Sequence, residues 1–463
     1  MSDTLLESAD DKAAPVHAVT ETGLDAVLQA GGDWLKALAQ VQDFTGKSGQ
    51  MLLSPTVEGG LSSVLYGIGE GGDPAAFRAL AAKLPAGDYR LERVPQGLEP
   101  NAVALAFALG GYRFDRYRKT REARARLHVA GADLAAVRGI SHACALARDM
   151  VNTPANDMGP LQIETIAREI AEQFGAKIAV VIGDALLEAN YPAIHAVGRA
   201  AHESRASRMV EVTWGDAAHP RVAIVGKGVV FDTGGLDIKP SAGMRQMKKD
   251  MGGAAHALAL GRMVMAAGLK VRLTLLIPVV ENAISGDAMR PGDILASRTG
   301  LTIEVGNTDA EGRLILADAL TRACELEPVL TIDMATLTGA ARVALGPQVI
   351  PFYTDDDALA DEIAAASLAV GDPLWRMPLW AGYEEALDSD IADIKNDPDG
   401  WAQAGSVTAA LFLKRFAPPQ SDTASWVHFD VFAWNPKAKP GSPAGAEAQA
   451  IRALFQVLSA RFG

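Results

Sequence analysis

Apolar, β-branched runs that alternate with helical segments dominate the chain after Pro160, and they restrict its fold more than any other feature. A strand that is apolar along its whole length is buried on both faces, which is typical of a parallel sheet covered by helices. The alternation therefore predicts an α/β architecture with a mostly parallel central sheet flanked by helices. The runs are residues 177–182, 222–225, 273–278 and 329–333.

The 463 residues exceed what one hydrophobic core usually supports, so the chain is expected to form more than one domain. We predict a small N-terminal α/β domain over residues 1–131, a connecting helix over 132–150 and a catalytic domain over 151–463. The first twenty residues are polar and are expected to be poorly ordered. Residues 75–81 have helical periodicity and are expected to form a helix. In residues 102–109 the large side chains alternate as in a strand, but the alanines between them favour a helix, so the sequence does not decide between helix and strand there.

The net charge of -13 argues against nucleic acid or an anionic membrane as the main partner. A basic stretch over residues 112–126 is interpreted as a solvated helix face or a subunit contact. Two cysteines, Cys144 and Cys324, predict no disulfide framework and fit a reducing compartment. No signal peptide and no apolar run of about 18 residues is recognisable, so a cytoplasmic location is expected.

Four carboxylates cluster around two glycine-rich motifs and suggest a divalent metal site. Residues 307–314 (Asn-Thr-Asp-Ala-Glu-Gly-Arg-Leu) contain Asp309 and Glu311, while Asp232 and Asp250 stand beside the glycine pairs 234–235 and 252–253. Carboxylate oxygens are hard donors suited to Mg²⁺, Mn²⁺ or Zn²⁺. Any one aspartate is more often a helix cap or turn residue, but that explanation does not account for all four together. We therefore predict a two-metal hydrolase.

Three cations accompany these carboxylates. Lys227 lies between two glycines at a strand end, and it is either an anion-binding lysine or a metal ligand with a neutral amine. Lys239 precedes Pro240 and is either a solvated lysine or a donor to a developing oxyanion. Arg313 offers a planar fork for an anion, but its pKa above about 12 prevents it from acting as a base itself. The Lys227 segment lacks the Walker A spacing, and a serine-hydrolase elbow with a histidine partner is not recognisable.

These motifs resemble the leucine aminopeptidase family, the two-metal cytosolic leucyl aminopeptidases. Residues 307–314 look like the family's signature octapeptide in full, and segments 225–235, 239–241, 247–255 and 335–340 agree in the same order. Residues 147–156 look like the segment that opens the family's catalytic domain. Weaker similarity continues through 375–379, 405–410 and 426–430, so the resemblance covers roughly Ala147 to the C-terminus.

The resemblance implies a set of metal ligands at the matching positions. Lys227, Asp232, Asp250 and Glu311 would surround one ion, and Asp232, Asp309 and Glu311 the other, so that two carboxylates are shared. The two divalent ions would be Zn²⁺ or Mn²⁺, with Mg²⁺ also suited to carboxylate-rich ligation.

The same resemblance implies the remaining parts of the site. Lys239 and Arg313 would be the catalytic cations, with Arg313 holding a bicarbonate that acts as general base. Met247, Thr336 and Gly339 would line the pocket for the N-terminal side chain, and a methionine wall fits Leu or Met. The reaction would be attack of a metal-bridging water on the first peptide carbonyl of a substrate with a free N-terminus. The family also implies a homohexamer.

The chain departs from the family pattern near the pocket. Asp237 places an extra acid two residues before Lys239, where it either raises the pKa of that lysine or faces solvent. Phe432-Ala433-Trp434 adds bulk after Asp430, which makes the side-chain preference an open question. Two other functions are weighed: a different two-metal hydrolase or phosphotransferase, and a regulatory or nucleic-acid-binding role for the same fold. The acidic charge and the lack of a recognisable phosphate cradle argue against both.

Overall fold

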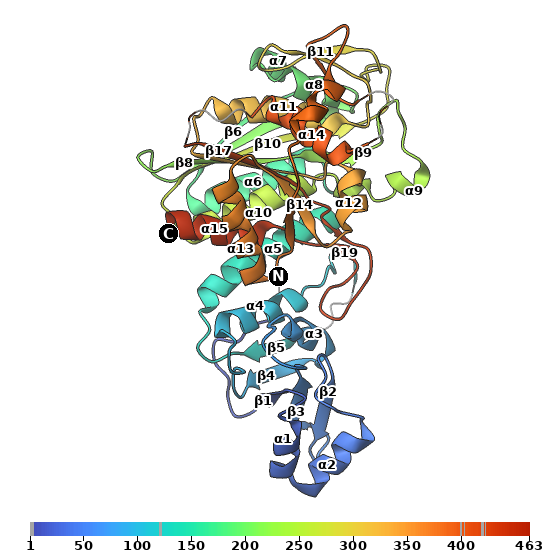
Figure 1. Cartoon of the computed structure of the whole chain (residues 1–463). Coiled ribbons are helices and arrows are strands. Elements are labelled where there is room, and N and C mark those ends of the chain that lie inside the picture. Colours follow the sequence, from blue (N-terminus) through green and yellow to red (C-terminus); the bar gives the residue numbers. More distant parts are fainter. Residues whose placement is uncertain (1–3, 120–122, 399–400, 402, 418–420, 422) are drawn as a thin grey trace. The chain divides into compact units, whose positions relative to one another are not determined.

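The protein is described from a computed structural model that covers residues 4–119, 123–398, 401, 403–417, 421 and 423–463. The chain divides into two compact units (Figure 1). The first contains Met1–Ala145 with Asn435–Ala444, and the second contains Leu146–Trp434 with Gly445–Gly463. The division falls inside helix α5 (Leu134–Asn152).

The first unit contains a five-stranded sheet with strand order β2-β3-β1-β4-β5. Its strands are β1 (Ala14–Val19), β2 (Met51–Pro55), β3 (Leu61–Gly67), β4 (Gly87–Leu91) and β5 (Ala125–His128). Its helices before α5 are α1 (Leu24–Ala30), α2 (Gly32–Val41), α3 (Ala76–Lys83) and α4 (Pro100–Gly110). Neighbouring strands are parallel except for the β2–β3 pair. Residues 102–109, which the sequence left open, therefore lie in a helix.

Two expectations for this unit are wrong. Ala14–Val19, inside the segment expected to be poorly ordered, is the central strand β1, because its apolar residues reach the buried face of the sheet. The helix-face interpretation of the basic stretch is also wrong where the stretch is described, because Arg126 lies in strand β5 and pairs with Asp88, and Arg124 pairs with Asp115. The alternative, a subunit contact, stays a prediction. Residues 120–122 of that stretch lie outside the described part of the chain.

The second unit is built on a nine-stranded sheet with order β15-β14-β17-β13-β8-β10-β7-β6, and with β9 paired to β10. Its strands are β6 (Lys177–Ile182), β7 (Arg208–Trp214), β8 (Arg221–Gly226), β9 (Gly228–Asp232), β10 (Arg272–Asn282), β13 (Leu330–Ala335), β14 (Ile350–Tyr353), β15 (Leu374–Arg376) and β17 (Ser425–Asp430). Small strands outside this sheet are β11 (Ile294–Ala296), β12 (Thr302–Glu304), β16 (Ile394–Lys395), β18 (Trp434–Asn435) and β19 (Gly445–Ala446).

The central strands of this sheet are parallel. β8 pairs in parallel with β10 and β13, and β13 pairs in parallel with β17. Antiparallel pairing is found for β7 with β10, for β6 with β7 and for β14 with β17. The predicted mostly parallel sheet is therefore confirmed. One strand differs from the expectation, since β6 lies at the edge of the sheet and is only partly buried.

Helices cover both faces of the large sheet (Figure 1). On one face α6 (Pro160–Phe174) and α10 (Gly252–Ala266) pack against the strands, and α15 (Ile451–Phe462) packs on α10. On the other face α8 (Pro192–Gly198) and α11 (Glu311–Cys324) pack against the strands, and α14 (Gly405–Lys414) packs on α11. The other helices are α7 (Ala185–Glu188), α9 (Ser241–Met244), α12 (Gly339–Leu345) and α13 (Asp357–Val370), with short 3-10 turns η1 (Glu203–Arg205), η2 (Met247–Lys249) and η3 (Ala381–Leu387).

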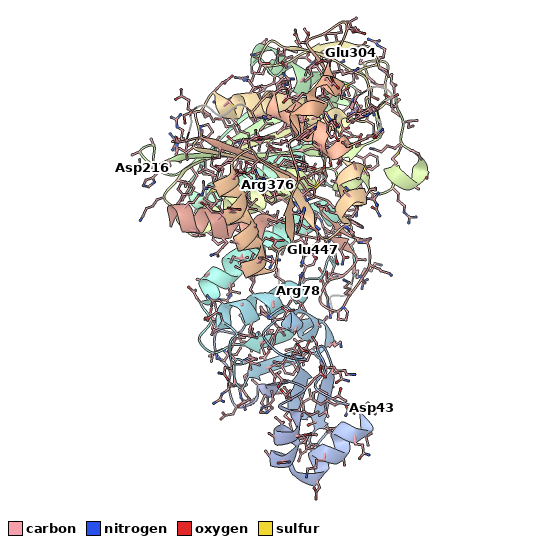
Figure 2. All side chains as sticks on the ribbon, in the orientation of Figure 1. Asp43, Arg78, Asp216, Glu304, Arg376 and Glu447 are labelled. Atoms are coloured by element: carbon pink, nitrogen blue, oxygen red, sulfur yellow. The ribbon has the colours of Figure 1, made fainter. Side chains whose placement is uncertain are left out.

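A buried ion pair connects two distant segments of the second unit. Arg148 of α5 is 1% exposed, and its Nε donates to Glu447 Oε1 at 3.1 Å. Glu447 is labelled in Figure 2. Removing one partner of such a pair leaves an uncompensated buried charge, so the pair fixes how the C-terminal segment returns to α5. Neither Cys144 nor Cys324 forms a disulfide. Among the described residues, no helix is long and apolar enough to cross a membrane.

Candidate metal centre

The candidate site forms where the parallel strands end. β8 ends at Gly226, immediately before Lys227, and β9 ends at Asp232. Ligands in open α/β sheets bind outside the carboxyl ends of the strands. Asp250 follows η2, and the remaining two carboxylates, Asp309 and Glu311, stand at the N-terminus of α11.

Three of the predicted carboxylates converge. Asp232, Asp309 and Glu311 each offer an oxygen within 4.8 Å of the others. The fourth, Asp250, is connected to this group through Lys227, whose Nζ lies 2.8 Å from Asp250 Oδ2 and 2.9 Å from Glu311 Oε1. All five residues that the family resemblance assigns to metal binding therefore lie in one cluster.

The two lysines lie between these carboxylates. Lys227 is 3% exposed, and its Nζ also donates to the carbonyl oxygen of Thr336 at 3.0 Å. Burial lowers the pKa of Lys227, but the charges of Asp250 and Glu311 raise it more. Lys239 Nζ lies 2.8 Å from Asp232 Oδ2 and 2.5 Å from Asp309 Oδ1, and these neighbours raise its pKa against the effect of burial.

The carboxylates are held at an energetic cost that a bound cation would remove. Glu311 Oε2 is buried without a hydrogen-bond partner, and Glu311 Oε1, Asp250 Oδ2 and Asp309 Oδ1 have only a lysine ammonium beside them. Burial, reinforced by the charge of Asp232, raises the pKa of Glu311 well above its ordinary value and that of Asp309 to about 6. Buried carboxylate oxygens that outnumber the lysines beside them are hard ligands and fit divalent metal ions. The residues present therefore suit a two-metal group.

Glycines let the backbone and Lys227 come this close. A Cβ added at Gly312 would lie 2.5 Å from Lys227 Cε and 2.6 Å from its Nζ. A Cβ added at Gly253, at the start of α10, would lie 2.1 Å from the carbonyl oxygen of Met334 in β13. Real Cβ atoms do not approach other atoms within 3.0 Å, so a side chain at Gly253 would collide with backbone and one at Gly312 would displace the end of the Lys227 side chain.

Arg313 is buried behind Glu311. It is 5% exposed, its Nη1 donates to the carbonyl oxygen of Asn396, and Asp397 Oδ1 lies 3.7 Å away. Burial lowers the pKa of Arg313, although the charge of Asp397 opposes this effect. Its buried Nε has no hydrogen-bond partner and is available to an oxyanion.

The predicted pocket residues lie next to the cluster but differ in what they contact. Thr336 is buried, and its hydroxyl donates to Asp250 Oδ1 at 2.8 Å, so it also positions a carboxylate. Met247 begins η2 and is half-buried, and its carbonyl oxygen accepts from the N–H of Asp250. Gly339 begins α12, and a Cβ added there would meet no atom within 4 Å, so open space borders this residue.

Several positioning residues were not recognised in the sequence. Asn282 Nδ2 donates to Asp232 Oδ1 at 2.8 Å and to the carbonyl oxygen of Thr308 at 3.1 Å. Asp237 is exposed, and its Oδ2 accepts from the N–H of Thr308 at 2.8 Å, so its hydrogen bond goes to the octapeptide and not to Lys239. Asn396 is fully buried, and its side-chain amide accepts from the N–H of Gly306, just before the octapeptide, and donates to the carbonyl oxygen of Asn307 within it. No local sequence motif marks these residues, because each acts on a segment far away in the chain.

Fold and site together define an α/β enzyme with a carboxylate-rich metal centre at the ends of parallel strands. Residues 145–455 match the model of the cytosol aminopeptidase family, catalytic domain, and residues 14–130 match that of the M17 aminopeptidase N-terminal domain. The chain belongs to the cytosol aminopeptidase family, whose members are metal-dependent peptidases.

Individual relatives agree with this assignment. The chain is 37% identical over 461 residues to a probable cytosol aminopeptidase of Syntrophotalea carbinolica, covering 91% of each chain. It is 40% identical over 449 residues to one of Rhizobium meliloti, covering 90% of this chain and 88% of the relative.

Solved structures agree as well. The cytosol aminopeptidase of Coxiella burnetii is 42% identical, with a TM-score of 0.94 over 100% of both chains. The bottromycin maturation enzyme BotP, solved in complex with Mn, is 34% identical, with a TM-score of 0.86 over 98% of this chain and 100% of that one. The predictions of the family, of the fold class and of a metal-dependent aminopeptidase are thereby confirmed.

Proposed function

We propose that the protein releases N-terminal amino acids, with Leu and Met preferred, from peptides with a free N-terminus. The observation that supports this most is the convergence of Asp232, Asp309 and Glu311 within 4.8 Å, with Glu311 Oε2 buried without a hydrogen-bond partner. Lys227 and Asp250 complete the proposed ligand set for two divalent ions, which are Zn²⁺ or Mn²⁺, with Mg²⁺ also suited to carboxylate-rich ligation. BotP, a relative solved with Mn, supports the presence of metal.

Two cations complete the proposed reaction. When bound, the metal ions would polarise the scissile carbonyl and make a water molecule nucleophilic near neutral pH. Lys239, whose ammonium lies between Asp232 and Asp309, would donate to the developing oxyanion. Arg313, with its unpartnered Nε, would hold a bicarbonate that accepts the proton of the attacking water. Met247, Thr336 and Gly339 would border the pocket for the first side chain.

The test compares a Leu-X dipeptide with its N-acetylated twin. The purified protein is stripped of metal and then refilled separately with Zn²⁺, Mn²⁺ or Mg²⁺. We expect metal-restored cleavage of the free-amine peptide only, because the α-amine is needed as a contact at the metal centre. Equal cleavage of both peptides, or cleavage without metal, contradicts the proposal. Omission and addition of bicarbonate at fixed pH tests the role given to Arg313.

We also propose the wider setting of the activity. The relatives are called cytosol aminopeptidases, which supports a cytoplasmic location. The family matches over residues 14–130 and 145–455 support an N-terminal domain over 1–131, a connecting helix over 132–150 and catalysis by 151–463. A homohexamer is expected from the family, and light scattering after size-exclusion chromatography decides it.

A further inference from the structure

The nitrogens of the Arg313 guanidinium are not equally occupied. Nη1 donates to the carbonyl oxygen of Asn396 and lies 3.7 Å from Asp397 Oδ1. The buried Nε has no hydrogen-bond partner among the described residues. An arginine holds an oxyanion through neighbouring N–H groups of its planar fork. The chain therefore occupies one part of the fork with Asn396 and Asp397, and it leaves the edge that carries Nε to a ligand.

The position of Asp397 is fixed by backbone pairing and by a hydrogen bond to the octapeptide. Strand β16 pairs in parallel with β12, and the N–H of Asn396, directly after β16, donates to the carbonyl oxygen of Glu304 at 3.0 Å. Asp397 Oδ2 accepts from Asn307 Nδ2 at 3.1 Å. One oxygen of Asp397 therefore faces Arg313 while the other is held by the first residue of the octapeptide, so the carboxylate has little freedom to turn away.

The charge of Asp397 acts on any anion that Arg313 binds. Coulomb repulsion between the carboxylate and a bound anion is proportional to the charge of the anion, so a dianion is repelled twice as strongly as a monoanion at the same place. Water screens this repulsion only in part, because the side chain of Arg313 is 6% exposed and that of Asp397 is 35% exposed. The carboxylate therefore weakens the binding of every oxyanion to Arg313, and it weakens the binding of dianions most.

We propose that Asp397 is a positioning residue that limits how tightly Arg313 binds an oxyanion and that selects monoanions, such as bicarbonate, over dianions, such as sulfate. The inference rests on the proposed function, in which Arg313 holds a bicarbonate. Asp397 acts through the guanidinium: it holds Nη1 toward the chain, leaves Nε to the ligand and repels anions of higher charge. Arg313 is thereby kept for a weakly bound base that can be replaced between turnovers.

Asp397→Asn is the variant that separates charge from shape. The asparagine has nearly the same size, and its carbonyl oxygen can still accept from Asn307 Nδ2, but the negative charge beside Arg313 is gone. Asp397→Ser is a second neutral variant, which removes the charge without adding an amide. Asp361→Asn is the matched control, because Asp361 is exposed on α13 and forms no ion pair or side-chain hydrogen bond with a described residue.

The experiment titrates metal-reconstituted protein with bicarbonate and, separately, with sulfate, at fixed pH in buffer freed of carbon dioxide. Chloride keeps the ionic strength constant, so that general salt effects are the same at every point. One readout is the rate of Leu-X cleavage, which bicarbonate should raise and sulfate should lower by competition for Arg313. The other readout is the Tm without substrate, which rises with any anion that binds the folded protein and needs no turnover.

We expect Asp397→Asn and Asp397→Ser to lower the half-effective concentration of bicarbonate by about tenfold and that of sulfate by about a hundredfold, since the repulsion that is removed is twice as large for the dianion. Both readouts should show these shifts, and Asp361→Asn should behave as the parent. A purely structural role of Asp397 would instead lower the Tm of the variants without a change in either half-effective concentration.

The outcomes separate this inference from the proposed function. Equal half-effective concentrations in the parent and in the Asp397 variants overturn the inference, as does a shift of the same size for both anions or the absence of any response to either. If the parent cleaves Leu-X in these cases, the proposed aminopeptidase activity stands. If the parent cleaves no Leu-X with any metal, the proposed function fails, and the Tm measurements alone decide whether Asp397 controls anion binding.

Discussion

Replacement of Gly312 by alanine tests whether the position of Lys227 is essential to the site. The added Cβ would lie 2.5 Å from Lys227 Cε, 2.6 Å from its Nζ and 2.7 Å from its Cδ. Lys227 has little freedom to move away, because Asp250, Glu311 and the carbonyl oxygen of Thr336 all bind its Nζ within 3.0 Å. The substitution changes no charge and removes no carboxylate, so its effect reports on geometry alone.

The expected magnitude follows from this overlap. Relief of contacts near 2.5 Å requires the lysine to shift by about 1 Å, and overpacking of this kind costs about 1–3 kcal/mol. Alanine in place of glycine in a helix returns at most about 1 kcal/mol. We therefore expect a net loss of about 1–2 kcal/mol in the free energy of unfolding and a Tm lower by a few degrees. A misplacement of about 1 Å at a catalytic site costs roughly 10²-fold in rate.

The assay combines kcat/KM for a Leu-X dipeptide, metal content after dialysis and a thermal melt. Gly139→Ala is the matched control, because Gly139 lies inside α5 and an added Cβ there meets nothing within 4 Å. We expect the control to keep the parent's kcat/KM and to melt at or slightly above the parent's Tm. If Gly312→Ala keeps both the parent's kcat/KM and its metal content, the argument that the site depends on the placement of Lys227 is refuted.

Three further predictions concern the charged groups. Glu311→Gln removes a buried carboxylate proposed to bind metal, so the variant should lose the rise in Tm on metal addition, and a rise equal to the parent's contradicts the role of Glu311. Lys239→Met should lower kcat roughly 10²–10³-fold with metal content retained, and an unchanged kcat removes Lys239 from the reaction. Burial and the charge of Asp232 raise the pKa of Asp309 to about 6, so below that pH the metal-free carboxyl holds a proton that metal must displace. Apparent metal affinity should therefore fall as pH falls below 6, by about tenfold per pH unit for each displaced proton, and titrations at pH 5, 6 and 7 that agree with one another contradict this.

The fold was predictable where the pattern is long and local. The strands that became β8, β10 and β13 read as continuous apolar runs because both of their faces are covered by helices. β1 was missed because a short strand near a polar terminus gives a weak signal, and its central place depends on β3 and β4, which lie far along the chain. The edge position of β6 was equally hidden, since its apolar sequence does not reveal that one side lacks a partner strand.

In the candidate site, too, the local associations were predictable and the long-range ones were not. Asp309, Glu311 and Arg313 lie within five consecutive residues, so their association is local and the motif alone brings them together. Asn282 and Asn396 act on Asp232 and on the octapeptide from other segments, and only the folded sheet shows that they are neighbours. Asparagines that hold a distant segment have no characteristic spacing in the sequence, and their contacts produce no periodic pattern from which they could be predicted.

Lys227 shows how the charges of this site depend on one another. The carboxylates of Asp250 and Glu311 raise its pKa against the effect of burial, so the amine carries a proton when these carboxylates are its partners. A lysine that binds a metal must have a neutral amine, which conflicts with this protonated state. The conflict is removed if divalent ions take the same carboxylates, because their positive charge cancels the potential that raises the pKa and leaves burial as the dominant effect. Lys227 would then change from a counter-ion of the carboxylates to a neutral donor, and its proton would leave as the metal enters. On this argument the lysine belongs in the site because it neutralises the carboxylates of the folded protein before metal does.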